Sequence, residues 1–166
     1  MVDVYITYDR YEHNEWFYVY NVDMDKDNAY NHCIETDLPD FIGYGPDDCH
    51  SFQLQRVSMT KKDLNKLKKF IKSDENGEGA CREFEDMMAK IFEGDYETEL
   101  ILSTDGQSDF FEIMEEYCGP EPEYDDFEDE NDYHNAYAEY QNKQDELMAN
   151  EEEFLKTIKE HIASCY

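Results

Sequence analysis

The sequence predicts an α+β fold: a ββαβα unit with a small antiparallel sheet, followed by a mainly helical, acidic second half. Apolar residues alternate with polar ones near the N-terminus, as in half-buried strands. Later apolar residues recur at three- and four-residue steps, as on one face of a helix. Charge is also divided unevenly, with a net −4 over residues 1–72 and −25 over residues 73–166. These observations divide the chain into a 1–72 unit and a 73–166 region, which can pack as one domain or two.

The first two strands are expected at residues 2–8 and 16–22. In both segments every second residue is apolar, and Asn14 lies between them at a position suited to a turn. The pattern favours a β-hairpin.

A helix and a third strand are expected next. Asp25 or Asp27 can cap a short helix that extends through Ile34. Residues 38–50 contain two prolines and two glycines, which indicates a loop. Residues 51–59 then alternate again and predict a third strand.

The helix that completes the first unit carries much of the positive charge of the chain. Thr60 and Asp63 have the spacing of a capping box, and Leu64 and Leu67 begin its apolar face. The same helix holds six of the 14 basic residues: Lys61, Lys62, Lys66, Lys68, Lys69 and Lys72. These lysines form either a small anion-binding face or, as we favour, an internal counterweight to the acidic half.

The second half is expected to begin with a linker at 73–79, a helix at 80–92 and a strand at 99–104. Ser108 can cap a further helix, which Gly119 and the proline after it would end.

A long helical pattern closes the chain from residue 133 to residue 163. Its stripe of apolar and aromatic residues is interrupted near Asn150, where we expect the helix to break or bend.

Composition indicates a folded protein with far more charge than solubility requires. Disordered acidic chains are poor in aromatic residues, whereas this one is 15% aromatic. The net charge is −29, against roughly 2 to 8 in magnitude for a well-behaved small domain. A halophilic origin would explain this excess without a specific function, but the abundance of large aromatic residues argues against it.

The cysteines and the apolar segments indicate a cytoplasmic protein. Five cysteines, an odd number, show no CxxC and no framework spacing, as expected of reduced thiols: Cys33, Cys49, Cys81, Cys118 and Cys165. The N-terminus does not resemble a signal peptide, and no apolar run approaches the length of a membrane span.

Three patterns suggest catalysis or metal binding, and each has a plainer explanation. Asp23, Asp25 and Asp27 match the first EF-hand positions, but the glutamate that should close the loop comes one residue late. The adjacent pairs His32-Cys33 and Cys49-His50 lack the spacing of a structural zinc site.

A carboxylate pair at Glu99 and Asp105 with Lys90 is indistinguishable from chance in so acidic a chain. We therefore expect no catalytic residues, no metal and no cofactor. Direct nucleic-acid binding is opposed by the charge.

The acidic surface is the strongest functional signal. Residues 109–153 hold 18 acidic residues and only Lys143 as a base. A helix rises about 1.5 Å per residue, so its carboxylates can approach the charge density of a nucleic-acid backbone. Aromatic residues between them can add the affinity of interface hot spots. The predicted partner-binding residues are Glu121, Glu123, Asp125, Asp126, Glu128, Asp129, Glu130, Asp132, Glu139, Asp145, Glu146, Tyr124, Phe127, Tyr133 and Tyr137.

In size and charge, with the acidic segment 121–132 and the helix after it, the chain resembles DNA-mimic inhibitors of phages and mobile elements. These include anti-CRISPR and anti-restriction proteins, and they share no common motif or fold. The resemblance implies a stoichiometric inhibitor in the cytoplasm of a bacterial host, acting on a CRISPR effector or restriction complex. One alternative is an immunity-type or adaptor protein that binds a basic toxin or regulator without mimicry. A second is a small metal-dependent enzyme.

Overall fold

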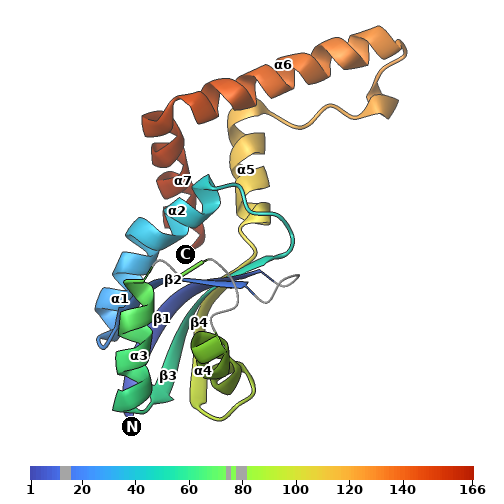
Figure 1. Cartoon of the computed structure of the whole chain (residues 1–166). Coiled ribbons are helices and arrows are strands. Elements are labelled where there is room, and N and C mark those ends of the chain that lie inside the picture. Colours follow the sequence, from blue (N-terminus) through green and yellow to red (C-terminus); the bar gives the residue numbers. More distant parts are fainter. Residues whose placement is uncertain (12–15, 74–75, 78–81) are drawn as a thin grey trace.

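A computed structural model of the chain describes residues 1–11, 16–73, 76–77 and 82–166 (Figure 1). Asn14 of the expected hairpin turn, Cys81 and residues 74–75 and 78–79 of the expected linker lie outside the described residues.

Four antiparallel strands form one sheet in the order β2-β1-β3-β4 (Figure 1). Their bounds are Val2–Tyr11 (β1), Trp16–Asp23 (β2), His50–Met59 (β3) and Glu97–Thr104 (β4). The antiparallel α+β fold expected from the sequence is therefore confirmed. Because β4 pairs with β3, the sheet joins segments from both sides of the expected division at residues 72 and 73.

One face of the sheet packs against two helices, α3 (Lys61–Ile71) and α4 (Arg82–Phe92) (Figure 1). Alternation along β1 turns Val4, Ile6 and Tyr8 toward these helices, and all three are fully buried. The Tyr8 hydroxyl remains satisfied within this core because it lies 2.6 Å from Oε1 of Gln53 on β3.

The other face of the sheet packs against a larger set of helices. These are α1 (Lys26–His32), the π-helical turn η2 (Cys33–Asp37), α2 (Leu38–Gly43), α5 (Gln107–Cys118) and α7 (Glu151–Cys165). Phe52 and Leu54 of β3 are fully buried beneath them, and Phe52 stacks on Phe41 of α2 at 4.9 Å between ring centroids. The sheet is thus the middle of three layers.

The expectation that residues 38–50 form a loop is wrong for their first part, which is helix α2. Its proline, Pro39, lies in the first turn of α2, directly after the π-helical turn η2. The helix is stabilised by burial of Leu38, Phe41 and Ile42, and together with α1 and η2 it makes residues 26–43 continuously helical.

The predicted cap of α3 is confirmed. The Thr60 side-chain oxygen accepts the Asp63 backbone N–H at 3.1 Å, and its hydroxyl donates to the Asp63 carboxylate at 2.9 Å. Leu64 and Leu67 are buried, whereas all six lysines of the segment are exposed.

The predicted Ser108 cap of α5 is wrong, because the helix begins one residue earlier, at Gln107, with Gly106 as its N-cap. Asp105 accepts the Ser108 backbone N–H at 3.0 Å and so supplies the capping carboxylate. Gly106 has φ of 72°, and a Cβ there would collide with the ring of Phe41.

The predicted break near Asn150 is confirmed. Helix α6 (Glu130–Ala149) ends there, and the Asn150 side chain accepts the Glu153 N–H at 3.3 Å to start α7. In Figure 1, α6 crosses the ends of α5 and α7 and continues well beyond the body of the molecule. Among the described residues, no helix has both the length and the apolar character that a membrane crossing requires.

Candidate partner-binding surface

The predicted binding residues lie together on a projecting arm, which we define as residues 119–149. Gly119, with φ of 82°, ends α5 and turns the chain outward. An extended segment and the 3-10 turn η3 (Tyr124–Asp126) lead to Asp129, whose carboxylate accepts the Asn131 N–H at 2.7 Å and caps α6. The segment before η3 runs alongside the outer part of α6 (Figure 1).

Five aromatic side chains form a continuous series in the arm, and contacts among three of them join its two halves. Tyr133 of α6 lies 5.2 Å from Tyr124 and 5.9 Å from Phe127, measured between ring centroids. The series continues along α6 through Tyr137, 5.9 Å from Tyr133, to Tyr140, 6.4 Å further on. Such pairs each contribute about 0.5 to 1.5 kcal/mol beyond burial. We call these five residues the aromatic cluster.

The inner end of the arm is fixed to the body. Tyr140 packs against the hydrophobic core, and Leu147 is 1% exposed within it. Burial, followed by the negative charge of Glu121, raises the pKa of Tyr140, which places Glu121 beside this part of α6. The acidic segment therefore runs antiparallel to α6, with residue 121 near residue 140 and residues 124–127 near residue 133.

The aromatic residues predicted as partner contacts are largely used inside the arm. Tyr124 is 57% exposed, whereas Phe127, Tyr133 and Tyr137 are half-buried in the aromatic cluster. Their contact with a partner stays a prediction, but the structure shows a scaffold role that the sequence pattern did not reveal.

All eleven predicted carboxylates are exposed. They are Glu121, Glu123, Asp125, Asp126, Glu128, Asp129, Glu130, Asp132, Glu139, Asp145 and Glu146. Within the described residues, none of them forms an ion pair with a lysine or arginine, and the one pair found joins Glu130 to His134 at 3.5 Å. The negative charge of the arm is thus directed to solvent.

The six lysines of residues 61–72 do not neutralise the arm by contact. No ion pair in the described part of the chain joins one of these six lysines to a carboxylate of residues 109–153. In Figure 1, α3 lies at the opposite end of the molecule from α6. Ion pairs with these lysines therefore do not offset the negative charge of the arm.

The other sequence candidates have structural roles. Asp25 accepts the Asn28 N–H at 2.9 Å and caps α1, and Asp23 accepts the Asp25 N–H at 2.8 Å. Glu99 pairs with Arg56 at 3.1 Å, in a group that ties β1, β3 and β4 together.

The two histidine–cysteine pairs do not form nucleophilic dyads. His32 pairs with Asp37 at 3.3 Å, and His50 pairs with Asp9 at 2.7 Å. Burial raises the pKa of the Cys33 thiol to about 12, and that of Cys49 is raised to about 11. Both shifts favour the neutral thiol, whereas a nucleophile needs the thiolate.

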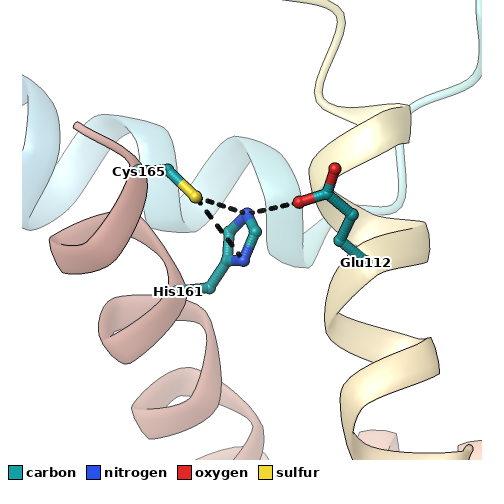
Figure 2. Close-up of side chains that lie close together, drawn as sticks. All are labelled: Glu112, His161 and Cys165. Carbon is teal, nitrogen blue, oxygen red and sulfur yellow. Dashed lines mark hydrogen bonds and ion pairs between the residues drawn. The ribbon is translucent and has the colours of Figure 1, made fainter.

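A cluster that the sequence analysis missed joins α5 to α7. Asp109 and His161 are both 7% exposed, and their Oδ1 and Nε2 atoms lie 2.9 Å apart. Figure 2 shows Glu112 and Cys165 on either side of the same imidazole. The four residues are separated by up to 56 positions in the chain, and no local spacing predicts their contact.

Comparison of the chain with protein-family models, with curated proteins and with solved structures gives no match.

Proposed function

We propose that this protein is a stoichiometric inhibitor whose arm occupies the positively charged nucleic-acid-binding surface of a partner. The observation that carries the proposal is the exposure of all eleven arm carboxylates without a lysine or arginine partner among the described residues. A basic groove shaped to hold phosphates would supply the missing positive charges, and association would be fast because it is steered electrostatically.

The density of charge on the arm supports mimicry of a duplex. Nine of the eleven carboxylates lie between residues 121 and 139. The matching stretch of α6, residues 130–140, is about 16 Å long. A duplex carries roughly nine phosphate charges over that length, and a single strand about half as many. The outer arm therefore has the linear charge of a short duplex.

The setting that fits this activity is phage counter-defence, in which the protein blocks a defence system of the bacterial host. The partner would be a CRISPR effector or restriction complex, met in the host cytoplasm, and the inhibitor would need no catalytic group. The arm supports this role because the aromatic cluster holds the charges in one arrangement before binding, which reduces the ordering cost of association.

The test begins with capture of partners from a bacterial lysate at low and high salt, followed by measurement of Kd with the purified partner. The main variant replaces Asp125, Asp126, Glu128 and Asp129 with lysine, and circular dichroism must show that α6 persists without its Asp129 cap. We expect the Kd to rise roughly 100-fold or more. Duplex oligonucleotides should compete for binding, and affinity should fall steeply with salt.

A matched control replaces four exposed carboxylates away from the arm with lysine: Glu35, Asp86, Glu93 and Asp95. It produces the same change in net charge, so retained binding would show that position matters. Binding that persists in excess duplex and survives the arm variant would reject mimicry and favour the immunity-type alternative. In cells with a restriction or CRISPR system, the unaltered protein should raise phage plaquing, and the arm variant should not.

A further inference from the structure

We propose that Asp109, Glu112, His161 and Cys165 form a zinc site that joins α5 to α7. One ligand atom each of Glu112, His161 and Cys165 lies within 4.8 Å of the other two. Imidazole, thiolate and carboxylate are the three ligand types that proteins use for Zn²⁺. This site is separate from the arm carboxylates and does not depend on the proposed inhibition.

The distances around His161 Nε2 fit a tetrahedral ion. Asp109 Oδ1 lies 2.9 Å from this nitrogen, Glu112 Oε2 lies 3.9 Å from it, and Cys165 Sγ lies 3.7 Å from it. Zinc bond lengths place tetrahedral ligands about 3.3 Å apart for nitrogen and oxygen, and about 3.6 Å apart for nitrogen and sulfur. Each of these separations from Nε2 lies within about 0.6 Å of such values. Asp109 lies outside the group of mutually close ligand atoms formed by Glu112, His161 and Cys165, so its side chain would turn toward the ion to become the fourth ligand. The ion would replace the thiol proton and the proton between His161 and Asp109, and both would pass to solvent.

Asp109 is positioned as a metal-site carboxylate would be. Its second oxygen, Oδ2, accepts hydrogen bonds from the Thr104 hydroxyl at 2.7 Å and from the Tyr166 hydroxyl at 2.9 Å. Oδ1 lies 2.9 Å from His161 Nε2 and also 3.2 Å from the Tyr166 hydroxyl, which is shared between the two carboxylate oxygens. Support of a ligand by surrounding hydrogen bonds is typical of metal sites and fixes the orientation of the ligand.

The site is open to solvent on one side. Glu112 and Cys165 are exposed, and both line a shallow surface pocket together with His161, Glu115, Glu116 and Ser164. The extra glutamates give the pocket a negative potential that draws in a divalent cation.

The same atoms do not suit a catalytic triad. In a triad the nucleophile and the orienting carboxylate contact different nitrogens of the imidazole. Here Asp109 lies against Nε2, and the Cys165 sulfur is also nearer to Nε2, at 3.7 Å, than to Nδ1, at 4.0 Å. Asp109 and Cys165 therefore do not contact opposite nitrogens of the imidazole, as the carboxylate and nucleophile of a triad do.

The experiment titrates the reduced, full-length protein with Zn²⁺ in competition with a chromophoric chelator. We expect one saturable ion per chain. Cys165→Ser and Glu112→Gln should each weaken binding by about tenfold or more. Because both side chains are exposed, these variants should keep the fold, as circular dichroism can verify. With Co²⁺ as the probe, the unaltered protein should show a thiolate-to-metal charge-transfer band that Cys165→Ser lacks.

Two neighbouring changes serve as controls for nonspecific binding to so acidic a chain. Glu115→Gln removes a nearby charge but no ligand, so it should weaken binding far less than Cys165→Ser or Glu112→Gln. Cys49→Ser removes a thiol from a different acidic turn and should leave the affinity unchanged. The four-lysine arm variant should also retain Zn²⁺, which separates this proposal from the inhibitory one. Absence of a saturable site, or equal affinity in Cys165→Ser and Glu112→Gln, would overturn the assignment.

Discussion

Replacement of Tyr133 by alanine tests whether the arm is held rigid by its own aromatic residues. The Tyr133 ring contacts those of Tyr124, Phe127 and Tyr137, all within 6 Å between centroids. Three such pairs, at the lower end of their range because the ring is half-exposed, amount to about 1.5 to 3 kcal/mol. The loss should act on the local opening of the arm, because Tyr133 belongs to neither hydrophobic core cluster.

Amide hydrogen exchange measures this opening directly. The Phe127 N–H donates to the Tyr124 carbonyl at 3.3 Å, and the Asp126 N–H donates to that of Glu123 at 3.1 Å. Their protection should fall roughly 10- to 100-fold in Tyr133→Ala, since about 1.4 kcal/mol corresponds to a factor of ten. Amides of the sheet should be unaffected.

A matched control is Tyr117→Ala on α5, where the side chain is 48% exposed. It should leave exchange at residues 123–129 unchanged. If Tyr133→Ala also leaves those amides unchanged, the aromatic cluster does not order the acidic segment, and the reasoning about a preformed surface fails.

Four further substitutions test the body of the protein and its junction with the arm. Leu147→Ala removes a buried side chain at the base of α6 and should lower the free energy of unfolding in urea by about 2 to 5 kcal/mol. Gly106→Ala places a Cβ against Phe41 at φ of 72° and should lower the free energy of unfolding by about 2 to 4 kcal/mol. Gly119→Ala, at φ of 82° with open space around it, should lower it by only about 1 to 2 kcal/mol. Burial raises the pKa of Asp37 to about 6, above an unfolded value of about 3.9. The folded state therefore binds this proton more tightly, and the stability it gives is complete below pH 4 and lost as pH rises through 6. Asp37→Asn should raise stability at pH 7 by roughly 1 to 3 kcal/mol and flatten the pH dependence of urea unfolding between pH 4 and 6; an unchanged profile would contradict the assigned burial.

Local patterns in the sequence were sufficient for most of the elements. Alternation located the strands because one-sided burial imposes a period of two. The Thr60 and Asn150 boundaries were predictable because capping depends on side chains within three residues. Helix α2 was missed because its proline and glycine resemble loop residues, whereas its stability comes from burial of Phe41 and Ile42 against distant segments.

The candidate sites also combine features that local sequence predicts with features that depend on distant contacts. Exposure of the arm carboxylates follows from their crowding in one segment. The use of Tyr133 and Tyr137 inside the arm depends on the return path of the chain, which charge counting does not reveal. The contact of Asp109 with His161 spans 52 positions and arises only when α5 and α7 pack side by side.

Because the chain bends at Asn150, the length of α6 sets how far the arm projects from the body. Residues 130–139 of α6, which lie on the tip side of Tyr140, belong to neither core cluster among the described residues, so packing against the body sets no limit on how far this end of the helix extends. Each turn inserted into α6, together with a matching extension of the segment beside it, would carry the tip about 5.4 Å outward without disturbing the layers below. The reach of the arm could therefore change independently of the stability of the body.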